Sequence, residues 1–331
     1  MTILLKPSGW DQTEVHGVRS FCDDKKFDLV WFPGIQEGDV NLYNKLQSPL
    51  YYEQISDLFT AVDRSHIIDT YSFSIAPATD NHPFFFHFFK WEQTPQVVAS
   101  FGHIMQPFGG SGFLVLLVLL VIVVIVSAFL IIMPLVITTH LGIKRRENWK
   151  KLRWRPFGYF SLLGFAFLFV EIPLIQQSIL IFGNPTYAFT IIVCVILVFS
   201  GIGSSISRWE KIPNQLMIFI LASLTILIAL IYPNLVRIAL GWSIFMRIAI
   251  TIGVISPLAL LMGFPFPIGL VKFGESDSQI IPWIWAVNGS VSVVASVLAA
   301  IMILSYGFRE VQLLGGLLYG IAAVLFISSS N

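Results

Sequence analysis

The sequence predicts a polytopic α-helical membrane protein of about seven transmembrane helices, preceded by a small incomplete α/β domain. The chain is 56% hydrophobic and only 12% charged, whereas soluble domains contain about 25% charged residues. Seven apolar segments follow residue 112, each near the roughly 20 residues that a membrane-spanning helix needs. Residues 1–110 are different, with 7 Lys+Arg and 13 Asp+Glu, so a polar, acidic region stands in front of the apolar one.

Three parts follow from this change of composition. Residues 1–95 are expected to form a partial α/β fragment of the Rossmann type, 96–112 a linker, and 113–331 a transmembrane helical bundle. The linker prediction rests on Pro107 and the Gly-Gly-Ser-Gly run after it, which precedes a bilayer span rather than an amphipathic helix. The seven spans are expected at about 113–138, 157–182, 186–207, 213–233, 243–268, 283–305 and 310–328.

The front region alternates short apolar runs with helical patterns. Residues 3–5 and 27–32 are short apolar runs that suit strands. Asp11 followed by Glu14 has the spacing of a capping box and predicts a helix over about 12–24. Apolar residues at helical spacing predict a second helix over 51–62. So few strands make a poor independent core, so we expect an incomplete domain, or one that docks on something else.

Glu171 is the sharpest candidate for function in the bundle. It lies inside an apolar span, which Pro173 is expected to interrupt, and Gln176 and Gln177 follow it. An intramembrane carboxyl is costly and usually faces a cavity or a partner. It therefore predicts either a proton or cation site, or a polar contact that only holds helices together.

Two further features of the bundle are candidates. Asn288 stands among small residues, which favours helix packing, although pairing with Glu171 or Gln176 is an alternative. The run from Gly263 through Pro265 and Pro267 should break the fifth span. Such breaks often line transport sites, but they also simply end helices.

Other kinds of site are not predicted. His82 and His87 are five residues apart, which does not match the four-residue spacing of two zinc ligands on one helix face. The two cysteines, Cys22 and Cys194, lie in regions of different polarity and give no metal site or disulfide framework. The net charge of +1 gives no reason to expect nucleic acid. We predict no catalytic residue, no metal and no cofactor for this chain alone.

The positive-inside rule gives the expected orientation. Residues 144–155 hold 7 Lys+Arg and one Glu, the pattern of a cytoplasmic loop. The chain is then expected to be a multi-pass protein of the plasma (inner) membrane with residues 1–110 outside. Arg237, Arg247 and Arg309 fall on the outer side and count against this orientation.

Several segments resemble membrane-bound spermidine synthase-like proteins. The most specific are EIPLIQ at 171–176, MGFPFPIG at 262–269 and WAVNG at 285–289. FDLVWFPG at 27–34 and ATDNHPFFFHFFKW at 78–91 extend the similarity to the front region. The resemblance implies a methyltransferase-like α/β domain joined to membrane helices, with this chain beginning in the late strands of that domain. Asn81 stands where the family often has Asp, and no residue matches the family's cofactor-binding loop or catalytic acid.

Three functions are compatible with these patterns. The first is a non-catalytic membrane subunit or split half, which binds another protein chain that completes the α/β domain, or packs in a larger membrane complex. The second is a transport component for a polyamine or another cation, using Glu171. The third is aminopropyl or methyl transfer, together with a partner that supplies the cofactor site.

Overall fold

The computed structural model describes residues 2–93, 95, 111–140, 154–207, 213–275 and 280–327. The chain divides into two compact units, Met1–Ala76 and Pro77–Asn331. Residues 77–93, expected in the front domain, therefore group with the membrane helices. The predicted linker at 96–112 and the basic loop at 144–155 lie almost entirely outside the described residues.

The first unit contains short helices and loops. Its helices are α1 (Gln12–Lys25), the 3-10 helix η1 (Glu37–Asp39), α2 (Leu50–Thr60) and α3 (Arg64–Thr70). The helices predicted at 12–24 and 51–62 are confirmed, and the Asp11–Glu14 capping box is present in full. Helix α3 was not predicted, although Asp63 caps it through the backbone N–H groups of Ser65 and His66.

The α/β character of this unit is not shown. Residues 3–5 and 27–32 were expected as strands, but within residues 2–76 the structure has no strand. A strand needs a neighbouring strand for its backbone hydrogen bonds, and no second strand lies beside either segment. Asp28 instead accepts hydrogen bonds from the backbone N–H groups of Leu42, Tyr43 and Asn44, which holds the following loop in place.

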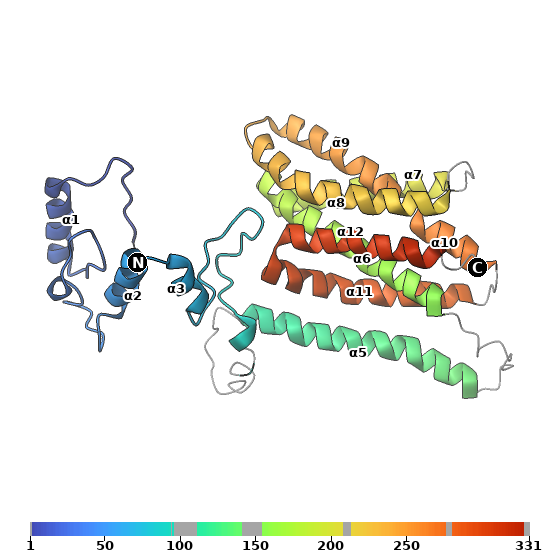
Figure 1. Ribbon diagram of the computed structural model, residues 1–331, viewed down its shortest axis with the longest axis horizontal. Helices are drawn as coiled ribbons and strands as arrows, with labels where there is room; N and C mark the ends of the chain where they lie inside the picture. Colours follow the sequence, from blue (N-terminus) through green and yellow to red (C-terminus); the bar gives the residue numbers. More distant parts are fainter. Residues whose placement is uncertain are drawn as a thin grey trace. The chain divides into compact units, whose positions relative to one another are not determined.

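The second unit is a bundle of long apolar helices (Figure 1). Seven helices among the described residues are long and apolar enough to cross a membrane, so the prediction of a polytopic helical membrane protein is confirmed. The short helix η2 (Trp91–Gln93) precedes them. The bundle helices are α5 (Ser111–His140), α6 (Trp154–Phe182), α7 (Pro185–Ile206), α8 (Asn214–Ala239), α9 (Ile244–Met262), α10 (Pro265–Gly274), α11 (Ile281–Tyr306) and α12 (Phe308–Ile327), of which α9 and α10 together make one span.

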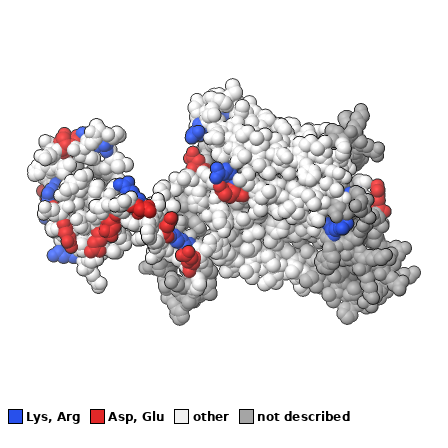
Figure 2. Space-filling model, viewed as in Figure 1, with Lys and Arg blue, Asp and Glu red and all other residues white. Residues whose placement is uncertain are grey.

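Helix α6 lies at the centre of the bundle. It packs against α7, α8, α11 and α12, while α9 packs on α7 and α5 packs on α11. On the face drawn in Figure 2, charged side chains gather at the ends of the bundle and leave its middle uncharged. We call the end where α5 begins the proximal end, because α6, α8 and α11 finish there and α12 starts there.

Prolines affect these helices in two ways. Pro173 was expected to interrupt the second span, but α6 continues through it. Membrane helices tolerate proline because neighbouring groups satisfy the freed backbone. The fifth span, by contrast, is interrupted: α9 ends at Met262 and α10 begins at Pro265.

Candidate functional site

A group of polar contacts surrounds the short connection between α11 and α12 in the second unit. Gly307 alone separates the two helices and has a φ of 101°, a left-handed conformation that favours glycine. A Cβ atom at this position would lie 2.6 Å from Nδ2 and 2.8 Å from the carbonyl oxygen of Asn81. Glycine is therefore required both by the backbone conformation and by the close approach of Asn81.

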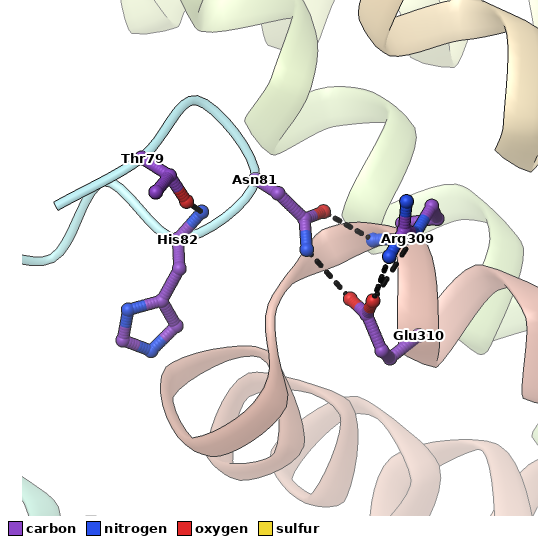
Figure 3. Close-up of polar contacts among 5 residues, drawn as sticks. All are labelled: Thr79, Asn81, His82, Arg309 and Glu310. Carbon is purple, nitrogen blue, oxygen red and sulfur yellow. Dashed lines mark hydrogen bonds and ion pairs between the residues drawn. The ribbon is translucent and has the colours of Figure 1, made fainter. Parts of the chain in front are cut away.

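Asn81 caps the start of α12 (Figure 3). Its backbone carbonyl accepts a hydrogen bond from the N–H of Phe308 at 3.0 Å, and its Oδ1 accepts one from the N–H of Arg309 at 2.8 Å. Its Nδ2 donates to Glu310 Oε2 at 2.6 Å. The first N–H groups of a helix have no partner within the helix, so Asn81 supplies acceptors that α12 itself lacks.

His82 caps the other helix of the junction. Its Nε2 lies 2.6 Å from the carbonyl oxygen of Leu304, near the end of α11. A carbonyl oxygen only accepts, so Nε2 carries the proton. The backbones of Thr79 and His82 bond to each other at 2.9 and 3.2 Å, which closes a tight turn. We call residues 79–82 the clasp, because this turn satisfies both helix ends.

The polar groups at the clasp are used in contacts that hold the two helix ends in place. Glu310 accepts from Asn81 and from Arg309, whose Nη2 lies 2.8 Å from Oε1, so its carboxylate is already bound. His87 lies against the ring of Phe113, with 5.3 Å between the ring centroids. Within the described ranges, no group of three His, Cys, Asp or Glu side chains is placed to hold a metal ion.

Three polar residues of α6, Glu171, Gln176 and Gln177, lie in its second half, at different depths of burial. Glu171 and Gln176 are partly exposed, and neither side chain has a hydrogen bond in the described part of the chain. Gln177 is buried, and both polar atoms of its amide lack a partner. Gln312 of α12 is in the same condition.

Helices α6 and α12 are packed closely, since a Cβ on Gly315 would lie 3.0 Å from a methyl carbon of Val170. Polar groups without partners inside such an interface are costly. Proton or cation binding is the chemistry that these side chains could support.

Asn288 does not pair with Glu171 or Gln176. Its Nδ2 donates to the carbonyl oxygen of Phe160 at 2.9 Å, about three helical turns before Glu171. A Cβ on Gly164 would lie 3.0 Å from the Asn288 carbonyl oxygen. Asn288 therefore joins α11 to α6 where a small residue lets the two backbones approach.

Neighbouring helices also pack closely against the break between α9 and α10. The Tyr159 hydroxyl donates to the carbonyl oxygen of Pro265 at 2.7 Å. A Cβ on Gly263 would lie 2.1 Å from the carbonyl oxygen of Ser200 in α7, so Gly263, just after α9, is one point where this chain segment and α7 approach closely. Pro267 lies inside α10.

Some polar residues were missed from the sequence. Ser178 Oγ lies 2.7 Å from the Tyr232 hydroxyl, joining α6 to α8, and the buried Thr251 hydroxyl of α9 has no hydrogen-bond partner among the described residues. A lone Gln312 in an apolar run was a visible signal. The capping role of Asn81 gave no local signal, because its partners are more than 220 residues away.

Comparisons with protein families, with curated proteins and with solved structures find no match to this chain.

Proposed function

We propose that this chain is a non-catalytic integral membrane subunit, or one half of a split spermidine synthase-like membrane protein, that carries and anchors a partner α/β polypeptide. The observation that carries the proposal is the uncovered apolar surface of residues 2–76. Among these residues, Val40 is the one buried side chain, at 6% exposure. Folding normally buries enough apolar surface to offset the conformational entropy of the chain, and this unit leaves its other apolar side chains half-buried or exposed.

The uncovered side chains include Ile3, Leu4 and Leu5 in the first segment expected as a strand, and Phe27 in the second. Leu5 is 88% exposed, and Ile3 and Phe27 are also exposed. Each large apolar side chain that becomes buried contributes about 1.5–3 kcal/mol. A partner sheet that adds strands beside residues 3–5 and 27–32 would cover them and supply the missing backbone hydrogen bonds. The resemblance of residues 27–34 to spermidine synthase-like proteins indicates the class of partner, which is a methyltransferase-like α/β chain.

The clasp suits the anchoring role. It lies directly after the boundary at Ala76–Pro77 and binds two membrane helices through Asn81 and His82. A subunit that carries another polypeptide needs a firm attachment between its carrying region and its membrane helices.

The proposal predicts that a neighbouring reading frame encodes a methyltransferase-like chain, and co-expression with that chain is the test. We expect a stoichiometric complex and slower amide hydrogen exchange in residues 2–76 of the complex than of the chain alone. Leu5→Asp and Phe27→Asp should abolish the complex, whereas the matched control Asp24→Lys, at an exposed polar position of α1, should preserve it. Unchanged exchange in the presence of that chain would contradict the proposal.

A nucleoside titration separates this function from an enzyme that acts alone. S-adenosylmethionine and its decarboxylated form should bind the complex and not the isolated chain. Tight binding by the isolated chain would instead support an aminopropyl- or methyltransferase contained in this chain.

A second function is favoured by the unpartnered polar groups in α6 and α12. Glu171 has no hydrogen bond within the described residues, and the amides of Gln177 and Gln312 are buried without partners. We propose a polyamine or other cation pathway as the alternative. Flux of spermidine or potassium into liposomes would test it, and Glu171→Gln should abolish the flux while Asn288→Ala, a packing variant, should retain it. Equal flux with and without Glu171 would exclude this residue from transport.

A further inference from the structure

The segment after the clasp has an unusual distribution of aromatic side chains. Residues 84–91, here called the aromatic strap, contain five phenylalanines and a tryptophan in eight positions. The backbone N–H of His87 donates to the carbonyl oxygen of Phe84 at 2.9 Å, so Phe85 and Phe86 are the central residues of a turn. Such positions favour Gly, Pro, Asn, Asp and Ser, and two phenylalanines there need another explanation.

The base of the turn is bound to the bundle on both sides. Phe84 packs edge-on against Phe308, the first residue of α12, with 5.5 Å between the ring centroids. His87 lies 5.3 Å from Phe113, near the start of α5. The turn is therefore held between two helix ends at the proximal end of the bundle.

The tip of the turn faces away from the protein. Phe85 is 64% exposed and Phe86 is 72% exposed, and their rings lie 4.2 Å apart. Phe84 and Phe89, on either side of the turn, pack against the bundle. Phe89 is buried, with 4.6 Å between its ring centroid and that of Phe113. The same short segment thus has an apolar side that the bundle covers and an apolar tip that no described residue covers.

The height of the strap along the bundle identifies what covers the tip. Phe113 is the second residue of the span Gly112–Ile131, and Phe89 and Trp91 both contact its ring. The contact with Phe308 is at the first residue of the span Phe308–Ile327. The strap therefore lies at the level where two candidate spans begin, and a bilayer matched to these spans would have its boundary between headgroups and acyl chains at that level. Trp and Tyr are enriched at this level in membrane proteins, and Phe is among the residues that interfacial helices bury there.

We propose that the aromatic strap is a lipid-binding element that inserts Phe85 and Phe86 into the proximal leaflet of the bilayer. The occupant of this surface is lipid, because an apolar tip held at the level of two span ends meets the acyl-chain boundary before any soluble partner. The proposal is independent of the function proposed above, since it concerns residues 84–91 and not the surface of residues 2–76.

Spin labels at single cysteines test the insertion. Cys22→Ser and Cys194→Ala remove the native thiols, and Phe85→Cys or Phe86→Cys provides the labelling site in the full chain, reconstituted in nanodiscs of phosphatidylcholine and phosphatidylglycerol. We expect collisions with oxygen to exceed collisions with a water-soluble nickel complex at both positions. The lipid control is Ile122→Cys, on an exposed face of α5, and the water control is Asp24→Cys, on α1. Ratios equal to those of Asp24→Cys would overturn the proposal.

A photo-crosslinker at the same site identifies the occupant directly. Benzoylphenylalanine in place of Phe86 preserves the aromatic character of the tip, so folding of the strap should be unaffected. Illumination in the same nanodiscs should add the mass of one phospholipid to the chain. A crosslink to a protein and none to lipid would show that another polypeptide covers the tip, and would overturn the proposal.

Discussion

Asn81 shows how much a single side chain can contribute when its amide has both a donor and an acceptor to satisfy. Its Oδ1 accepts from the N–H of Arg309, while its Nδ2 donates to Glu310, 229 residues away in sequence. An aspartate would keep the first contact but would place a second negative charge 2.6 Å from the Glu310 carboxylate. The amide is therefore the group that fits between a helix N-terminus and a carboxylate.

Replacement of Asn81 should weaken the attachment of the clasp in a graded way. Asn81→Ala removes the cap, and we expect it to reduce the free energy of unfolding by about 1–2 kcal/mol. Asn81→Asp should lose less, because it retains the acceptor for Arg309. Thermal unfolding in detergent measures both variants. A larger loss for Asn81→Asp than for Asn81→Ala would mean that repulsion from Glu310, and not the helix cap, controls this contact.

At the scale of elements, close helix contacts in the bundle depend on glycines that face a neighbouring backbone. A Cβ on Gly203 of α7 would lie 1.9 Å from the carbonyl oxygen of Leu260 in α9, whereas a Cβ on Gly201 would meet nothing within 4 Å. The two glycines are on the same helix, two residues apart, and they face different surroundings. They make a matched pair for measuring what the α7–α9 contact requires.

We expect Gly203→Ala to destabilise the bundle and Gly201→Ala to be neutral or slightly stabilising. Overpacking of a close interface costs about 1–3 kcal/mol, while alanine in an open helical position is favoured over glycine by up to about 1 kcal/mol. The midpoint of thermal unfolding in detergent distinguishes the two variants. Equal midpoints would show that α9 shifts away from α7 without cost.

The attachment of the aromatic strap should depend on pH through His87. Burial against Phe113 lowers the pKa of His87 below its usual value of 6.5, and nearby His82 lowers it further. The released strap therefore takes up a proton more readily than the bound strap does. The contribution of His87 to binding is complete above the unfolded value and is lost as pH falls through that value toward the folded one.

Amide hydrogen exchange in residues 84–91 measures this dependence. After correction for intrinsic rates, we expect faster opening of the strap at pH 5.5 than at pH 7.5. His87→Phe keeps the ring contact with Phe113 and should remove the acceleration. An acceleration that persists in His87→Phe would place the titrating group elsewhere in the clasp or strap.

For the whole molecule, the sequence predicted the parts that depend on composition along the chain. Seven spans follow from apolar length alone, and the break near Gly263 follows from two closely spaced prolines. The sequence did not predict the hydrogen-bond partner of Asn288, because packing decides which face α11 turns to α6. The sequence also did not reveal that residues 27–32 form no strand here, because a strand forms only when another strand lies beside it.

The three arginines that count against the predicted orientation also make contacts that the sequence did not predict. Arg247 donates to the carbonyl oxygens of Ile181, Leu240 and Trp242, which lie at or beyond the ends of α6 and α8. Arg309 binds Glu310, and Arg237 donates to Asn234. An arginine that satisfies the last carbonyls of helices has a local structural reason for its position. Arg247 therefore weighs less against the orientation than an unattached loop charge would.

The remaining evidence on orientation is the basic run at 144–155, and it predicts a cytoplasmic location for that loop. With seven spans, the region before α5 and the region after α12 must then lie on opposite sides of the membrane. Asn148→Cys and Ser8→Cys, each in the Cys22→Ser and Cys194→Ala background, can be treated with a membrane-impermeant maleimide in oriented vesicles. We expect inside-out vesicles to label position 148 alone, and right-side-out vesicles to label position 8 alone. The reverse pattern would invert the topology, and labelling of both positions from one side would require an even number of spans between them.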